Sequence, residues 1–138
     1  FMSQLFSMLR IGGTYICADF VDASNLLSID NHGRRHYESY VKSLKSYGLS
    51  FNFEAQSAYE DALSLAGFEL TKLHDHTPES VDIAKRELAN LRGNNITNMQ
   101  TILGDTFYRK RRTMSKLRYK ALESRGCNHL HFHSIRPV

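Results

Sequence analysis

A pair of glycines between an amphipathic run and a short apolar run constrains the fold of this chain more than any other feature. Residues 1–10 place apolar side chains at helical spacing, and Gly12-Gly13 are predicted to supply the left-handed cap that ends this helix. The β-rich apolar run at 14–18 predicts a strand buried on both faces. Asp19 and Phe20 then come at its carboxyl end. Since ligands of open α/β sheets bind beyond the carboxyl ends of the strands, these two residues are predicted to lie at the mouth of a site.

Size and composition restrict the chain to one globular domain. It has 138 residues, of which 41% are hydrophobic and 23% charged, so a modest core is possible and a disordered tail is not expected. No apolar run approaches the roughly 20 residues that span a bilayer, and the start lacks the features of a signal peptide. We therefore expect a cytoplasmic protein without a membrane partner. Phe1 in place of a starting Met favours a segment cut from a longer chain.

The rest of the sequence predicts helices and strands in the order α-β-α-α-β-α-α-β. Gly67 is expected to end the third helix, and Thr77 to cap the fourth, with Pro78 in its first turn. The predicted segments are a loop over the site at 21–35, helices at 37–47, 52–66 and 78–91, a strand at 68–74, a break at 93–95, a helical region through 107 into the basic segment, and a last strand at 127–135.

Positive charge is concentrated near the C-terminus. Between Asp105 and Arg125, eight Lys and Arg residues and two acidic residues carry a net charge of +6, whereas the whole chain carries +4. Such a segment favours an anionic partner, either a phosphate group or a nucleic acid. A nucleic-acid-binding or accessory module without catalytic activity, built on Arg109-Lys110-Arg111-Arg112, is therefore an alternative interpretation. Few aromatic residues lie near it for stacking on bases, so nucleic acid is not the expected partner.

The cysteines and histidines suggest two further chemistries. Cys17 and Cys127 lie in apolar strand-like segments, which predicts buried, reduced thiols rather than a disulfide. Five histidines alternate along two predicted strands and would face one another if these strands pair, so they could share a zinc ion. No acidic residue or cysteine completes a known ligand spacing, and hydrogen-bonded or exposed histidines are expected instead. The five are His74, His76, His129, His131 and His133.

Several short motifs resemble the second half of class I S-adenosylmethionine-dependent methyltransferases. Residues 9–13 (Leu-Arg-Ile-Gly-Gly) resemble the Leu-x-Pro-Gly-Gly turn that leads into the fifth strand of that family. Residues 12–47 look like the phosphoethanolamine (phosphobase) N-methyltransferases, where a strand ending in Asp-Tyr is followed by Glu-Tyr-Val-Lys-x-Arg-x-Tyr. Here Asp19-Phe20 and Ser39-Tyr40-Val41-Lys42 stand at those places, and Ala66-Gly67-Phe68 fits the end of a following helix. The resemblance covers nearly the whole chain and is loose after Ala84.

The chain departs from the pattern of that family at several positions. Ile11 replaces the proline of the turn, and Phe20 lacks the hydroxyl group of the family tyrosine. Leu44 stands at the place of the family arginine, with Lys45 next to it. Tyr47 aligns with the closing tyrosine after a one-residue insertion, and the lysine of the family's C-terminal basic segment falls near Lys116.

The resemblance implies an α/β fold, namely the C-terminal half of a Rossmann-like methyltransferase sheet with its last three strands and a helical substrate lid. Residues 1–138 would be a partial methyltransferase domain, and residues 21–50 the lid within it. No strand here leads through a Gly-x-Gly turn into a helix, so S-adenosylmethionine is expected to be bound by a missing N-terminal half, in cis or in trans. The isolated chain is expected to be inactive, with an unpaired edge on its first strand.

The same resemblance implies a substrate and the residues that would hold it. The expected reaction is N-methylation of a small phosphorylated amine such as phosphoethanolamine, a step of phosphocholine biosynthesis. Asp19 and Tyr40 are the expected catalytic residues, although Asp19 is equally suited to capping the following loop. Aromatic faces suit an amine that becomes a quaternary cation, and basic side chains suit its phosphate. The expected substrate-binding residues are Phe20, Tyr40, Lys45, Tyr47 and Lys116.

Overall fold

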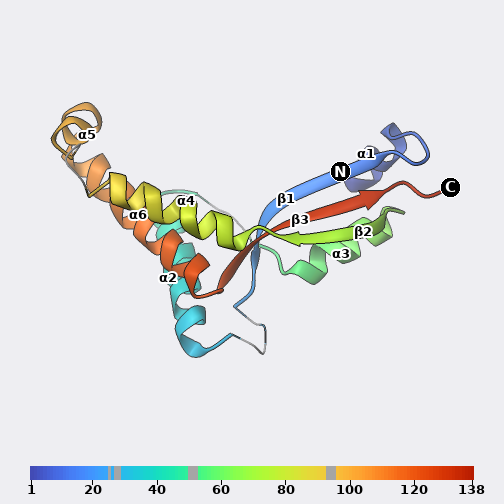
Figure 1. The fold of residues 1–138 in the computed structure, drawn as a ribbon, viewed down its shortest axis with the longest axis horizontal. Helices are drawn as coiled ribbons and strands as arrows, with labels where there is room; N and C mark the ends of the chain where they lie inside the picture. Colours follow the sequence, from blue (N-terminus) through green and yellow to red (C-terminus); the bar gives the residue numbers. More distant parts are fainter. Residues whose placement is uncertain (25, 27–28, 50–52, 93–95) are drawn as a thin grey trace.

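The computed structural model describes residues 1–24, 26, 29–49, 53–92 and 96–138. In Figure 1 the sheet lies toward one end of the molecule with α1 and α3, and the other helices gather at the opposite end. In chain order the elements are α1 (Met2–Met8), β1 (Thr14–Asp22), α2 (Asn31–Ser46), α3 (Gln56–Leu65), β2 (Glu69–Asp75), α4 (Thr77–Asn90), α5 (Ile96–Leu103), α6 (Asp105–Glu123) and β3 (Cys127–Ile135). No helix within these ranges is long and apolar enough to cross a bilayer.

The three strands form one sheet in the order β1-β3-β2, and both outer strands run antiparallel to β3. β1 and β2 are therefore parallel to each other. Their carboxyl ends lie at the same end of the sheet, on either side of the start of β3. The predicted α/β class is confirmed. The last strand begins and ends at the predicted residues, with His129 and His131 on one face and Leu130 and Phe132 on the other.

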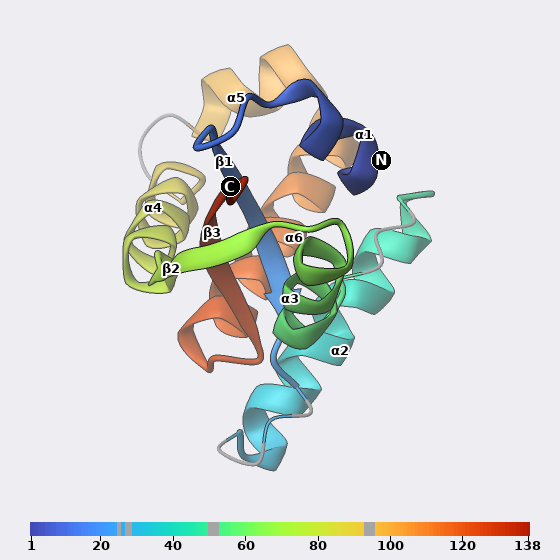
Figure 2. The same ribbon diagram turned by 90° about the vertical axis from the view of Figure 1, so that its right-hand side faces the viewer.

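The two faces of the sheet differ in what covers them. On one face Val21, Leu130 and Phe132 are buried together with Leu63 of α3, and side chains of α1 pack over the same cluster. Most of the opposite face of β1 is open among the described residues: Ile16 on it is 54% exposed, whereas Phe20, near its end, packs on side chains of α2 and α6. The prediction of a strand buried on both faces is therefore wrong, because α1 and α3 both pack on the same side. Figure 2 shows α3 in front of the crossing strands, viewed from the sheet end.

The glycine pair near the N-terminus does not cap α1. The helix ends at Met8, and Leu9, its C-cap residue, is extended. Gly12 has the expected left-handed backbone with φ of 72°, but it lies in the turn that follows, where its N–H donates to the carbonyl of Arg136. β1 also continues to Asp22, beyond the predicted range of 14–18. Asp19 and Phe20 consequently lie inside the strand and not at its end.

The loop predicted at 21–35 is shorter than expected because Asp30 starts a helix. Its carboxylate accepts a hydrogen bond of 2.7 Å from the N–H of Gly33, which satisfies a free donor of the first turn. α2 thus begins at Asn31, six residues before the predicted start at Tyr37. Gly33 also lets this helix approach the end of α6, since an added Cβ would lie 2.7 Å from the carbonyl oxygen of Ser124.

Other element boundaries are partly as predicted. Gly67, with φ of 92°, follows α3 as expected. Thr77 is not the N-cap of α4 but its first residue, and its buried hydroxyl accepts a 2.9 Å hydrogen bond from the N–H of His129. Gly104, with φ of 75°, separates α5 from α6 and so adds one helix to the predicted order. The predicted break at 93–95 lies outside the described residues, as does the predicted start of a helix at Asn52.

Candidate functional site

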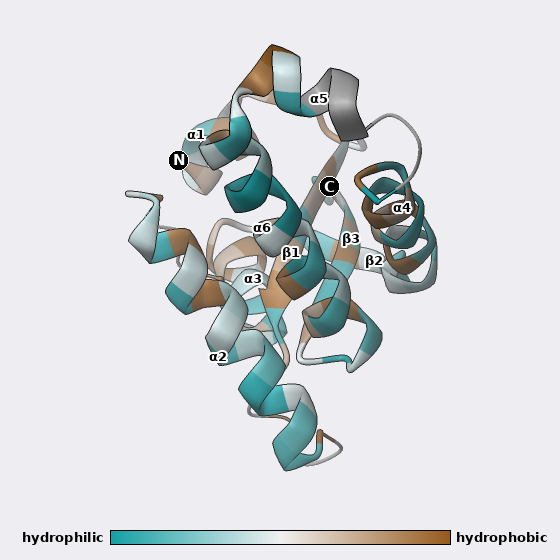
Figure 3. Ribbon diagram, turned by 90° about the vertical axis from the view of Figure 1, so that its left-hand side faces the viewer, coloured by the Kyte–Doolittle hydropathy of each residue, from teal (hydrophilic) through white to brown (hydrophobic). Residues whose placement is uncertain are grey.

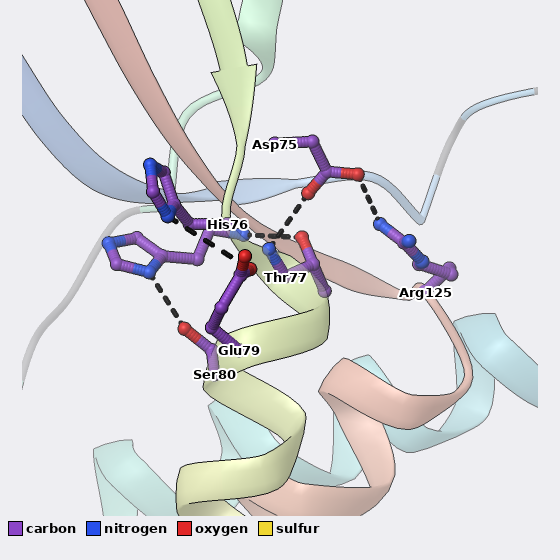
Figure 4. Close-up of polar contacts among 7 residues, drawn as sticks. Asp75, His76, Thr77, Glu79, Ser80 and Arg125 are labelled. Atoms are coloured by element: carbon purple, nitrogen blue, oxygen red, sulfur yellow. Dashed lines mark hydrogen bonds and ion pairs between the residues drawn. The ribbon is translucent and has the colours of Figure 1, made fainter.

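Polar side chains gather where the carboxyl end of β2 meets α4 (Figure 4). Asp75 accepts a hydrogen bond of 2.8 Å from the N–H of Thr77 and one of 2.6 Å from the guanidinium group of Arg125. Burial would raise the pKa of Asp75, but these bonds outweigh it and lower the pKa below its usual value. The ionised carboxylate therefore joins the end of β2, the start of α4 and the turn before β3.

Four of the five predicted histidines contact one another through their rings, namely His74, His76, His129 and His131. The ring centroids of His76 and His131 are 3.9 Å apart, and Ser80 Oγ lies 2.7 Å from Nδ1 of His129. Phe20 of β1 stacks on the ring of His129 at 4.8 Å. Burial and the neighbouring imidazoles lower the pKa of both His129 and His131, which favours their neutral forms at neutral pH.

This histidine cluster has the geometry of packed rings and not of a metal centre. Among the described residues, no group of three His, Cys, Asp or Glu side chains is placed to hold an ion. The rings of His76 and His131 lie over each other with an interplanar angle of 33°, so their contact is ring against ring.

A second polar group lies inside the helical layer, around Glu87 of α4. Its carboxylate accepts hydrogen bonds of 3.0 Å from Arg111 and from Ser115 of α6, and it also pairs with Arg118. Tyr40 of α2 lines the same pocket, whose volume is about 170 Å³. Burial would raise the pKa of Glu87, but the two guanidinium groups and the Ser115 hydroxyl lower it overall. We call this group of five side chains the Glu87 pocket.

The end of the sheet described above and the Glu87 pocket both border one buried cluster, which is formed by Tyr37, Ala121 and Cys127. Phe20 from β1 and Tyr40 from α2 both pack on it. Burial raises the pKa of Tyr40, although Arg118 acts in the opposite direction, so its hydroxyl group stays neutral. The ring of Tyr40 thus lies in one pocket with the guanidinium groups of Arg111 and Arg118, and it shares a buried cluster with Phe20. We call the rings of Phe20 and Tyr40 the aromatic wall; this arrangement suits a ligand with a cationic part and an anionic part.

Phe20 and Tyr40 are the predicted site residues that the fold brings together. Asp19 points to the other face of β1, where its Oδ2 accepts a 2.6 Å hydrogen bond from the hydroxyl of Tyr59 on α3. Its Oδ1 accepts from the N–H of Phe20 at 2.8 Å. Asp19 thereby attaches α3 to the sheet, and it does not face Tyr40.

The other predicted residues lie at the margins of the helical layer. Tyr47 is the C-cap residue of α2, and the ammonium group of Lys110 lies 5.5 Å from the centre of its ring. Lys45 and Lys116 are exposed on α2 and α6. The positive charge beside Tyr40 comes instead from Arg111 and Arg118, which were not among the residues predicted to bind substrate.

The spacing of residues on α6 carries a signal that could have revealed these arginines. Arg111, Ser115 and Arg118 follow one another at intervals of four and three residues, so they share one face of the helix. Fewer positive charges of the basic segment are available to a ligand than its net charge suggests. Four of its arginines pair with carboxylates of this chain, namely Arg109 with Asp105, Arg111 and Arg118 with Glu87, and Arg125 with Asp75.

Comparison with known proteins finds likeness in structure and none in sequence families. No protein-family model matches the sequence. No curated protein matches it either. Phosphoethanolamine N-methyltransferase 2 of Haemonchus contortus, solved with phosphomonomethylethanolamine and S-adenosylhomocysteine, matches with a TM-score of 0.76 and 15% identity, over 99% of this chain and 29% of that one. A cyclopropane synthase of Mycobacterium tuberculosis matches with a TM-score of 0.80 and 10% identity, over 97% of this chain and 48% of that one.

A third match is a protein described as a sarcosine dimethylglycine methyltransferase of Galdieria sulphuraria, with a TM-score of 0.75 and 8% identity, over 99% of this chain and 46% of that one. This chain therefore spans about half the length of these structures or less. Identities this low show the fold and not the substrate. The fold is the predicted α/β class, a three-stranded antiparallel sheet with helices, and it is similar to part of each of these structures. That this part is the C-terminal half of a methyltransferase sheet stays a prediction.

Proposed function

We propose that this chain is the substrate-binding half of an S-adenosylmethionine-dependent N-methyltransferase acting on a small phosphorylated amine such as phosphoethanolamine. The observation that carries the proposal is the match of the sheet and helical layer together, over 97–99% of the chain, to two structures named as methyltransferases and to a cyclopropane synthase. One of these structures holds a phosphorylated amine. The runner-up, a nucleic-acid-binding module, is less favoured because four of the five arginines of the basic segment pair with carboxylates of this chain.

The residues of this chain do not fit the methyl donor itself. The connections from β1 to α2 and from β2 to α4 contain no glycine, so neither supplies the glycine-rich turn that binds such a cofactor after a strand. In the proposal, a second half provides that turn, in cis or in trans, and bound S-adenosylmethionine supplies an activated methyl group. The present chain contributes binding and orientation of the amine.

In this proposal the Glu87 pocket binds the phosphate of the substrate and the aromatic wall binds its amine. Tyr40 and Phe20 offer aromatic faces to the amine, and a cation–π contact becomes stronger as positive charge develops on its nitrogen. Arg118 and Arg111 offer charge-assisted hydrogen bonds to the phosphate, the role that the resemblance implied for Lys45 and Lys116. α2 carries Tyr40 and lies within residues 21–50, the proposed lid. Holding the amine in one orientation is the main contribution this half can make to the rate.

The proposal is tested with the native polypeptide that carries this chain, purified with its natural N-terminus. We expect transfer of labelled methyl groups from S-adenosylmethionine to phosphoethanolamine, and a rise in KM of at least tenfold in Arg118→Ala. Arg112→Ala, an exposed position on α6, is the matched control and is expected to leave KM unchanged. Tyr40→Phe keeps the ring, so it separates loss of the hydroxyl group from loss of packing.

Two outcomes contradict the proposal. A protein that binds S-adenosylmethionine but methylates no phosphorylated amine would refute the substrate class. A protein without methyl transfer that binds DNA or RNA, with an affinity that falls steeply as salt rises, would favour the runner-up. Circular dichroism of each variant shows whether the fold is retained.

A further inference from the structure

A second cavity lies between α4, α5 and α6 and shares Glu87 and Arg111 with the Glu87 pocket. Its volume is about 720 Å³, inside the range of roughly 300–1,000 Å³ typical of pockets for small molecules. Ile102 of α5 is 80% exposed, and Ile83 of α4 and Phe107 of α6 are also exposed. We call this cavity the α4–α6 groove, and its apolar walls are formed by Ile83, Leu91, Ile102, Leu103 and Phe107.

α5 and the start of α6 lie at the end of the molecule farthest from the sheet (Figure 1), and residues of both helices line the groove. In Figure 3 part of α5 is coloured as hydrophobic, in contrast to the largely hydrophilic colours along α6. An apolar concavity on an otherwise hydrophilic helical layer exposes surface that water solvates poorly, so a ligand that covers it gains free energy.

Positive charge lies beside these apolar walls. Arg86 of α4 and Arg111 of α6 both line the groove, together with Glu87 and Asn90. Arg111 and Arg118 both pair with the carboxylate of Glu87, so two positive charges lie beside one negative charge. Nε of Arg86 donates to the backbone carbonyl of Asp82 at 3.4 Å. The polar side of the groove therefore favours an anion.

We infer that the α4–α6 groove binds a single-chain amphiphile with an anionic head group, such as a fatty acid. The alkyl chain lies along the apolar walls, and the head group is held by Arg86 with Arg111 behind it. A second copy of this chain would bring the same cationic side chains together and is disfavoured by their repulsion. This binding site goes beyond the proposed methyl transfer, and Arg111 and Glu87 line both pockets.

Dodecanoate and decanoate, used below their micellar concentrations, are the probes for isothermal titration calorimetry. Each methylene buried in the groove is expected to raise affinity about fourfold, because its transfer from water contributes about 0.8 kcal/mol. Dodecanoate is therefore expected to bind about 15-fold more tightly than decanoate. Dodecyltrimethylammonium, with the opposite charge, is expected to bind at least tenfold more weakly than dodecanoate.

Variants locate the site. Ile83→Asp and Arg86→Ala are each expected to weaken dodecanoate binding at least tenfold. Leu65→Asp, on α3 and 88% exposed, is the control for an apolar side chain outside the groove, and Arg112→Ala is the control for charge. Both controls are expected to bind dodecanoate as the unchanged protein does. Because all four positions are exposed, loss of folding is not expected, and thermal unfolding checks this.

The inference is overturned if the cationic amphiphile binds as tightly as dodecanoate, or if Ile83→Asp and Arg86→Ala bind like the two controls. Binding to anionic phosphatidylglycerol vesicles without binding of monomeric dodecanoate would also overturn it, in favour of a membrane surface. None of these measurements involves methyl transfer, so the inference and the proposed function fail separately.

Discussion

Replacement of Glu87 by Gln is expected to loosen the packing of α4 on α6. The carboxylate accepts from Arg111 and Ser115 and pairs with Arg118, whereas an amide of the same shape keeps the hydrogen bond from Ser115 and loses both ion pairs. Hydrogen bonds to charged groups contribute about 1.5–3 kcal/mol, and exposed ion pairs about 0–1 kcal/mol. The side chain of Glu87 is 23% exposed and that of Arg111 is 55% exposed, so screening reduces the Arg111 pair most. We expect a loss of about 2 kcal/mol at pH 7, chiefly from Arg118.

The loss should depend on pH in a defined direction. The folded-state pKa of Glu87 lies below the ordinary 4.5, because its arginine partners outweigh the effect of burial. The carboxylate therefore contributes its full stability above pH 4.5 and loses it as pH falls through the folded pKa. The difference between the unchanged protein and Glu87→Gln is expected to be largest at pH 7 and to shrink below pH 4.5.

Urea unfolding followed by far-ultraviolet circular dichroism at pH 7 and pH 3.5 measures both effects, with m-values compared to check the two-state assumption. Glu38→Gln, an exposed carboxylate on α2, is the matched control and should change stability by less than about 0.5 kcal/mol. If Glu87→Gln matches Glu38→Gln at pH 7, or if its deficit is the same at both pH values, the charge of Glu87 does not hold the two helices together.

Three further predictions concern Gly126, His131 and Cys127. Gly126→Ala is expected to cost about 1–3 kcal/mol by urea unfolding, because its Cβ would lie 2.3 Å from the carbonyl oxygen of Gly33; unchanged stability would contradict this close approach. Burial and neighbouring imidazoles lower the pKa of His131, so the unfolded chain binds its proton more readily and stability should fall as pH drops below 6.5. His131→Gln should therefore flatten the change of Tm between pH 7.5 and 5.5, and an equal slope would argue against the effect. Burial raises the pKa of Cys127 to about 12, so iodoacetamide should label Cys17 first in the folded protein and both thiols in urea, as seen by mass spectrometry; equal rates in the folded protein would contradict this.

Features that depend on neighbours along the chain were predicted well. The alternation in Cys127–Ile135 predicted the strand with its histidine face, because successive side chains of a strand point to opposite sides whatever the strand pairs with. Gly67 was predicted as the end of α3 for the same local reason, since a left-handed residue there favours glycine. The start of α2 also had a local signal in the sequence, because Asp30 is its N-cap residue. The polar composition of 21–35 nevertheless favoured the prediction of a loop.

Features that depend on what lies opposite in space were predicted poorly. Nothing near Asp19 in the sequence indicates Tyr59, 40 residues away, as its hydrogen-bond partner. The Glu87 pocket needs α2, α4 and α6 to pack together before Tyr40 meets Arg118. Lys45 lies one residue after the place of the family arginine and Lys116 lies near that of the family lysine, yet their helices present both side chains to solvent.

The sequence by itself determined the α/β class, the placing of the last strand and the charge of α6, because periodicity, glycine conformation and composition act over short distances. Only the tertiary structure decided which face of β1 is covered, which carboxylates neutralise the arginines, and that aromatic and cationic side chains meet around Tyr40. Those properties come from the packing of elements distant in the chain, where burial and pairing depend on the partner that the fold supplies.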